Sequence, residues 1–189
     1  MRNEPVGGFR SAPLEQVHDW AVWSLVRGNF TDPDGTAFSR TFVTSPGAVG
    51  VVALRDTPSG LNVILVRQYR PALHRLTLEL PAGMRDQEGE DPLLTAQREL
   101  QEEVGMVAGS WQRLGKHISA PGISDSCVEV FLARDLQVVD TDRHGPEERH
   151  MTIEEIAFVE ALAMVTDGRL DDAKTVIGLL MTERLLRAT

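Results

Sequence analysis

Residues 98–105 read RELQEEVG. On a helix, this stretch places Glu99, Glu102 and Glu103 on little more than one turn, beside a single arginine. Like charges at positions i and i+4 weaken a helix by roughly 0.2–0.5 kcal/mol per pair. A solvated acidic face is the usual fate of such a helix, but the stretch also suits a positively charged ligand. Hard divalent metal ions are such a ligand, because they prefer oxygen donors.

The helix that carries these glutamates has predicted ends. Asp91 can cap its N-terminus with Pro92 at the first helical position, and Gly105 suits a left-handed C-terminal cap. Between them, apolar residues at offsets of 3, 4 and 4 form a stripe for packing on a sheet: Leu93, Ala96, Leu100 and Val104. We therefore expect a helix over residues 91–104, with the glutamates at the margin between core and solvent.

Strand-prone segments precede and follow this helix. Residues 18–44 predict a hairpin of two strands, 18–29 and 37–44, around the turn signals Asp-Pro and Asp-Gly. Further strands are expected at 48–54, 61–69, 76–83, 127–136 and 151–159, and two helices between 158 and 187, separated around DGRLDD. This order predicts a mixed α/β (α+β) sandwich and not a Rossmann sheet. We divide the chain into an N-terminal β segment, 1–45, and a main domain, 46–189.

The composition is that of an ordinary globular protein and speaks against several functions. Acidic residues outnumber basic ones by 28 to 19, and the net charge of −9 argues against non-specific binding to nucleic acid. No apolar run approaches the roughly 18 residues that span a bilayer, and the N-terminus lacks the apolar core of a secretory signal. The single cysteine, Cys127, cannot form an internal disulfide. We therefore expect a cytoplasmic protein with no membrane partner.

A longer pattern surrounds the three glutamates. Gly83 and Glu90 precede the helix, and seven residues separate Glu90 from the run RELQEEVGM, residues 98–106. This resembles the Nudix box, in which Gly, five residues, Glu and seven residues precede Arg-Glu-aliphatic-any-Glu-Glu-any-Gly-aliphatic. Every specified position from Glu90 to Met106 matches, but six residues instead of five follow Gly83. The extra residue enlarges the loop before the helix and leaves the helix in register.

The resemblance implies a Nudix-type α/β/α sandwich with a mixed sheet, which hydrolyses a nucleoside diphosphate linked to another group. It implies two or three Mg²⁺ ions, with Mn²⁺ as a substitute, because divalent ions share oxygen ligands between protein and phosphates. Arg98 and Glu90 would orient the helix and the loop, and Arg98 and Glu102 would belong to the catalytic machinery. The implied metal ligands are Glu99, Glu102, Glu103 and the carbonyl of Ala82.

Three further stretches resemble the ADP-ribose pyrophosphatase branch of the family. They are QYRPALHRLTLELPAG at 68–83, SAPGISDS at 119–126 and DDAKTVIGLL at 171–180. Pro121 lies 15 residues beyond Met106, where this branch carries a proline. The implied reaction is Mg²⁺-dependent cleavage of ADP-ribose to AMP and ribose 5-phosphate. The alternatives are another nucleoside diphosphate sugar, such as GDP-mannose, and a non-catalytic module that binds such a metabolite.

The same resemblance suggests residues beyond the box. Arg70, and more weakly Arg40, are candidates for binding phosphate or ribose, since arginine suits bidentate contact with phosphate, and Pro121 is a third substrate-binding candidate. A glutamate in loop 140–151 would activate water, with Glu147 aligning best and Glu148 as the alternative. In that loop Arg149-His150 stands where relatives often carry another acidic residue. The N-terminal segment would mediate a homodimer.

Overall fold

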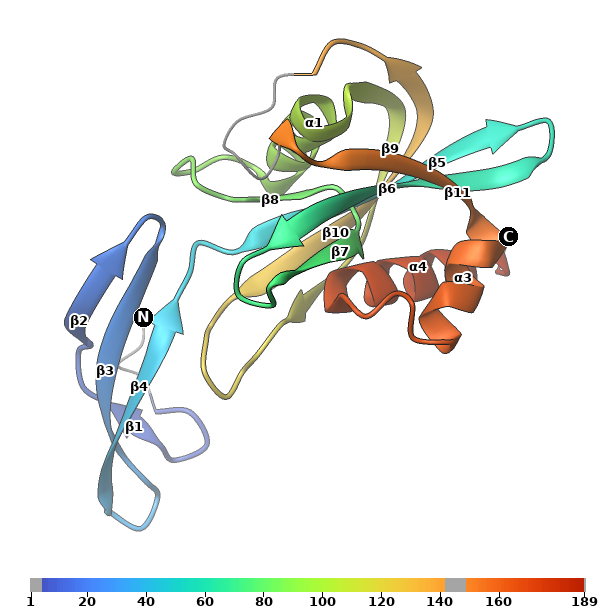
Figure 1. Cartoon of the computed structure of the whole chain (residues 1–189). Helices are drawn as coiled ribbons and strands as arrows, with labels where there is room; N and C mark the ends of the chain where they lie inside the picture. Colours follow the sequence, from blue (N-terminus) through green and yellow to red (C-terminus); the bar gives the residue numbers. More distant parts are fainter. Residues whose placement is uncertain (1–4, 142–148, 189) are drawn as a thin grey trace. The chain divides into compact units, whose positions relative to one another are not determined.

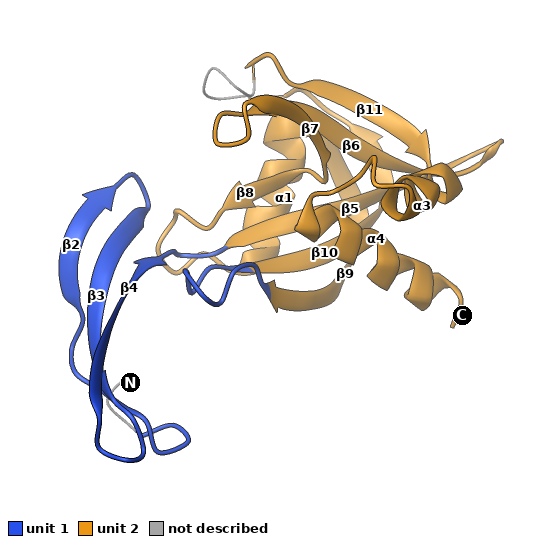
Figure 2. Ribbon diagram, turned by 60° about the horizontal axis from the view of Figure 1, so that its bottom comes forward, with its two compact units in different colours: residues 1–47, 118–127 blue, residues 48–117, 128–189 orange. Residues whose placement is uncertain are grey.

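The computed structural model describes residues 5–141 and 149–188. The chain divides into two compact units, which Figure 2 colours separately. The smaller unit comprises Met1–Gly47 with Ile118–Cys127, and the larger comprises Ala48–His117 with Val128–Thr189. Among the described residues, no helix is both long and apolar enough to cross a membrane.

A mixed sheet of seven strands forms the centre of the larger unit (Figure 1). Its strands are β5 (Ala48–Thr57), β6 (Gly60–Arg70), β7 (Arg75–Glu79), β8 (Ala82–Met84), β9 (Met106–Ile118), β10 (Cys127–Val138) and β11 (Thr152–Ala157). They lie in the order β11-β6-β5-β10-β9, with β7 paired to β6 and β8 paired to β5. β5 and β10 run parallel, whereas β6 is antiparallel to β5, β7 and β11.

Helices cover both faces of this sheet. They are α1 (Pro92–Val104), α3 (Phe158–Thr166) and α4 (Ala173–Leu186). The core on the α1 face contains Val49, Val51, Ile64, Val66, Ala96, Leu100 and Val104. The core on the α3 and α4 face contains Val52, Leu54, Val63, Leu65, Phe158, Ala161 and Leu179. The predicted α/β/α sandwich is confirmed, and the central strands read as continuous apolar runs because both of their faces are buried.

Helix α1 has the ends that its sequence predicts. The Asp91 carboxylate accepts the Leu93 N–H at 2.8 Å, and Pro92 occupies the first turn. Gly105 adopts φ 64° and its N–H donates to the Gln101 carbonyl at 2.9 Å. The cap at each end satisfies backbone groups that have no partner within the helix.

The smaller unit contains a larger sheet than the predicted two-stranded hairpin. Its sheet has four strands, β1 (Arg10–Ser11), β2 (Glu15–Trp20), β3 (Trp23–Thr31) and β4 (Ala37–Thr44), in which β3 pairs with the other three. The prediction of one strand over 18–29 is wrong, because the chain reverses at Ala21, where φ is 46°. Trp and Val raise strand propensity on both sides of this turn. The turn contains no glycine or proline, so the sequence gives no signal for it.

Two strands of the larger unit also depart from the prediction. The expected strand 76–83 is split into β7 and β8 around Pro81, which has no N–H to donate to a ladder. Strand β9 was not predicted, because its residues mix polar and apolar types and most are half-buried or exposed. In the smaller unit, the segment after β9 is tied to β4, since the Val43 N–H donates to the Ile123 carbonyl at 2.9 Å.

The end of α1 provides a test of backbone fit. We expect Gly105→Ala to lower the free energy of unfolding by about 1–3 kcal/mol, because a side chain is strained at this positive φ. The new Cβ would also lie 2.7 Å from the Val139 carbonyl oxygen. Gly89→Ala is the matched control, since Gly89 has φ 78° but nothing lies within 4 Å of a Cβ added there. Urea unfolding of both variants measures the difference, and equal costs would contradict the expected crowding at Gly105.

Candidate active site

The glutamates of α1 lie against the backbone of β8. Glu103 is buried, with 4% of its surface exposed, and its Oε2 accepts the Ala82 N–H at 2.9 Å. Glu99 packs on Gly83, where an added Cβ would lie 1.9 Å from the Glu99 Cδ. Glycine is therefore required at this position for the carboxylate to approach the strand. The helix and the strand together bring Ala82, Glu99 and Glu103 into one place, as the Nudix box implies.

Arg98 lies at the centre of the acidic cluster. Its Nη1 donates to Glu99 Oε1 at 2.9 Å and to Glu102 Oε2 at 3.0 Å. Its Nη2 lies 3.4 Å from Asp86 Oδ1 and 3.5 Å from Glu90 Oε2. The hydrogen bond from Thr95, with help from Arg98 and against the effect of burial, holds the pKa of Glu90 below its ordinary value. One guanidinium thus contacts four carboxylates from the loop and the helix.

A second charged cluster joins the end of β7 to the start of α4. Glu79 is 2% exposed and forms a bidentate pair with Arg70, with Nε to Oε1 at 2.7 Å and Nη2 to Oε2 at 2.6 Å. Thr77 and Lys174 also donate to the Glu79 carboxylate. Burial by itself would raise the pKa of Glu79, but Arg70 and Lys174 lower it to about 2. The Glu79 carboxylate is therefore ionised at neutral pH.

This second cluster lies close to the first. The pKa of Arg70 is raised, chiefly by its hydrogen bonds to Glu79 and more weakly by the charges of Asp172 and Glu103. Sequence reasoning selected Arg70 but missed Glu79 and Lys174. Both lie in the stretches ELPAG and DDAKT, which the family resemblance includes, but nothing in the sequence shows that their side chains meet.

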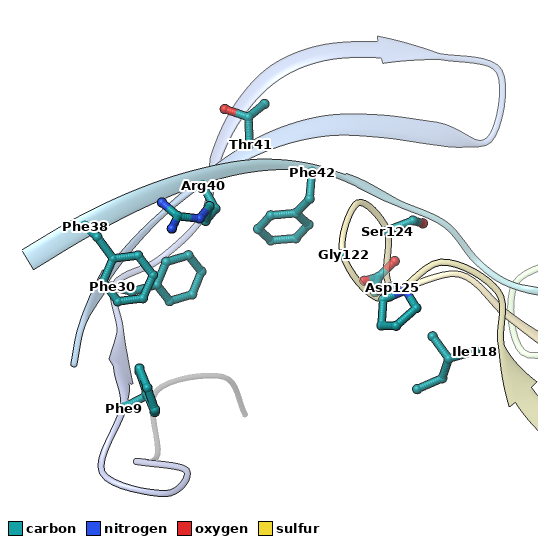
Figure 3. A pocket seen from close by; sticks show the side chains of 11 residues that line it. Phe9, Phe30, Phe38, Arg40, Thr41, Phe42, Ile118, Gly122, Ser124 and Asp125 are labelled. Carbon is teal, nitrogen blue, oxygen red and sulfur yellow. The ribbon is translucent and has the colours of Figure 1, made fainter. Parts of the chain in front are cut away.

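The other predicted residues lie elsewhere. Arg40 and Pro121 belong to the smaller unit, where they line a pocket of about 560 Å³ with four phenylalanines (Figure 3). These are Phe9, Phe30, Phe38 and Phe42. The Arg40 guanidinium lies 5.2 Å from the centre of the Phe38 ring. The two candidate bases, Glu147 and Glu148, lie outside the described residues.

The donor set suits a hard divalent cation. The groups around α1 are carboxylate oxygens beside a strand backbone, and Gly83 leaves the space that Glu99 occupies. In residues 5–141 and 149–188, however, no three or more His, Cys, Asp and Glu side chains are grouped so that they could hold a metal ion. Arg98 bonds both Glu99 and Glu102 in this arrangement. Metal binding by these glutamates would therefore compete with their ion pairs to Arg98.

Comparisons with known proteins agree with this geometry. The NUDIX domain model matches residues 44–176. An ADP-ribose pyrophosphatase of Mycobacterium tuberculosis (strain ATCC 25618 / H37Rv) is 38% identical over 172 residues, covering 91% of this chain and 82% of that protein. An ADP-ribose pyrophosphatase of Bacillus subtilis (strain 168) is 36% identical over 161 residues, covering 85% of each protein.

The fold has a close counterpart among solved structures. The crystal structure of an ADP compounds hydrolase superposes with a TM-score of 0.83 and covers 98% of this chain and 97% of that one. At 21% identity, this likeness concerns the fold. The match of the domain model over most of the chain, with the two bacterial relatives, settles the family. The chain belongs to the NUDIX domain family.

Proposed function

We propose that this protein hydrolyses the diphosphate bond of ADP-ribose to AMP and ribose 5-phosphate, with a divalent metal requirement. The observation that carries the proposal is the meeting of Glu99 and Glu103 with the backbone of Ala82 and Gly83. The two relatives named ADP-ribose pyrophosphatase support the choice of substrate. A non-catalytic binding module would have no need of three glutamates on one face of α1.

Glu99, Glu102, Glu103 and the Ala82 carbonyl would hold two or three Mg²⁺ ions, for which Mn²⁺ could substitute. When bound, such ions polarise phosphoryl oxygens and lower the pKa of water. Arg98 and Glu90 keep the loop and the helix together, through the contacts of Arg98 with Glu90, Asp86 and Glu102. Arg98 also neutralises the carboxylates while they are not engaged with a metal.

Arg70 would bind the diphosphate. Its side chain is 41% exposed, and Nε and Nη2 are both held by Glu79. Its Nη1 makes no hydrogen bond to any described residue, so this edge of the guanidinium is available to an anion. Arginine favours phosphate because its planar group presents donors in a fixed geometry.

Residues away from α1 have three further proposed roles. Glu147, or Glu148 as the alternative, would activate the attacking water. Residues 1–45 would mediate a homodimer, since the side chains of Val17 and Trp20 on β2 are 46% and 42% exposed. Arg40 and Pro121 would contact substrate from the phenylalanine-lined pocket. We also propose that the protein is cytoplasmic.

The first test is hydrolysis of ADP-ribose with Mg²⁺, followed by chromatography of AMP. We expect Glu103→Gln to lower kcat by more than the ~10–100-fold typical of losing a group that only supports a metal ligand. Glu160→Gln is the matched control, because Glu160 is exposed on α3, and it should retain wild-type activity. Chelation with EDTA should abolish activity and Mg²⁺ should restore it.

Other outcomes of the same assay are informative. If the wild type leaves ADP-ribose intact but cleaves GDP-mannose or another nucleotide sugar, the substrate is wrong and the chemistry stands. If it binds these compounds and cleaves none of them, the protein is a binding module. Full activity of Glu103→Gln would show that the Glu103 carboxylate does not serve the reaction.

Gly83 gives an independent test of the α1 site. In Gly83→Ala the Cβ would occupy the position of the Glu99 carboxylate, so we expect weaker Mn²⁺ binding and a loss of kcat. Gly168→Ala is the control: nothing lies within 4 Å of an added Cβ there, and its φ of 80° shows what backbone strain far from Glu99 does to Mn²⁺ affinity. Electron paramagnetic resonance titration of Mn²⁺ measures the affinity. Unchanged Mn²⁺ affinity in Gly83→Ala would separate Glu99 from metal binding.

A further inference from the structure

The Glu79 carboxylate receives hydrogen bonds from three different side chains in the larger unit. It is nearly inaccessible to solvent and accepts hydrogen bonds from Arg70, Thr77 and Lys174. Burying a carboxylate is unfavourable unless donors and cations compensate it. Arg70 and Thr77 fill three of the roughly four acceptor positions of a carboxylate. Lys174 fills the fourth and adds a second positive charge.

Hydrogen bonds at the start of α4 hold Lys174 next to this carboxylate. Asp172 caps the helix by accepting the Thr175 N–H at 3.0 Å, and it also accepts from Lys174 Nζ at 3.0 Å. The Thr175 hydroxyl donates to Asp172 at 2.6 Å and accepts the Leu80 N–H at 2.8 Å. Because Leu80 follows Glu79, this bond fixes the helix to the strand next to the carboxylate. The stretch DAKT thus holds Lys174 in one position, with its side chain 12% exposed.

The contacts of Glu79 with Lys174 affect how strongly Arg70 attracts an anion and how its guanidinium is oriented. Paired with Glu79 alone, the Arg70 guanidinium would offer an incoming anion little net attraction, because the two charges nearly cancel. Lys174 donates to Oε2, the same oxygen that receives Arg70 Nη2. Lys174 divides its charge between Glu79 and Asp172, so it offsets only part of the Glu79 charge. Its bond to Glu79 also fixes the plane of that carboxylate, which in turn fixes the guanidinium. The cluster lines a pocket of about 340 Å³, so it faces an accessible space and not the closed core.

We propose that Glu79 and Lys174 are positioning residues, which hold the Arg70 guanidinium with its Nη1 edge toward the diphosphate of the substrate. This inference rests on the proposed function, because it assigns Arg70 to substrate binding. It adds that the last helix of the chain tunes affinity for the anionic substrate through Arg70.

A double-mutant cycle separates positioning from stability. We expect Lys174→Met to raise KM for ADP-ribose about tenfold with little change in kcat, an effect within the range seen for residues that share one network. In the background of Arg70→Met, the same substitution should change KM by less than about twofold, because no guanidinium is left to orient. Lys174→Arg should restore most of the affinity. Thermal unfolding of each variant shows whether it is folded.

Glu183→Gln is the matched control. Glu183 lies on the same helix, α4, but within the described part of the chain its ion pair is with Arg187 and not with the Glu79 cluster. It should keep the wild-type KM. Equal effects of Lys174→Met with and without Arg70 would overturn the inference, since a merely structural lysine acts independently of Arg70.

A spectroscopic measurement tests the same point without substrate. The Arg70 Nε–H, donated to a buried carboxylate, should give a slowly exchanging ¹H–¹⁵N resonance, assigned by its absence in Arg70→Met. Glu79→Gln and Lys174→Met should accelerate its exchange, and an unchanged resonance in Lys174→Met would overturn the inference. If the wild type cleaves no nucleoside diphosphate, the proposed function fails and the positioning role falls with it. If the wild type is active but the cycle is additive, only the positioning role fails.

Discussion

The hydrogen bond from the Ala82 N–H to Glu103 is the contact on which the rest of the site depends. It joins β8 to α1; the Glu103 side chain is buried and Ala82 is half-buried. A buried carboxylate without a donor would be strongly unfavourable. Packing Leu100 and Val104 on the sheet therefore requires β8 to lie where its backbone can reach Glu103. Once this is satisfied, Glu99 lies against Gly83 and the acidic face is complete.

Arg98 explains why a helix tolerates so many glutamates. Only its pairing with Glu102, one turn away, is evident from the sequence. Asp86 and Glu90 approach the same guanidinium from the loop before α1. A single partly buried cation thus stabilises carboxylates from two elements, and such contacts are screened less by salt than exposed pairs. Arg98 therefore supplies part of the positive charge that compensates these carboxylates.

Much of this fold could be predicted because its signals are local. Asp91, Pro92 and Gly105 define α1 through caps that involve residues at most a few positions away. The apolar runs of β5 and β6 likewise follow from burial on both faces. The turn at Ala21 has no such signal, because its residues favour strands. β9 has no marked periodicity, since it is only partly buried.

The site could be predicted in part because its signal is also local. The box places three glutamates on one short segment, so their proximity follows from helical geometry. Glu79 and Lys174 are 95 positions apart, and no local pattern indicates that they meet.

The long separation of Glu79 from Lys174 has a consequence for how the chain folds. Contacts between distant positions are costly to form, because they close a long loop. The β6–β7 hairpin can form early from neighbouring residues, but its glutamate then lacks one of its cations. Docking of α4 completes the neutralisation and ties Leu80 to Thr175 in the same event. The hairpin and the final helix therefore stabilise each other, because each holds a charge that the other compensates.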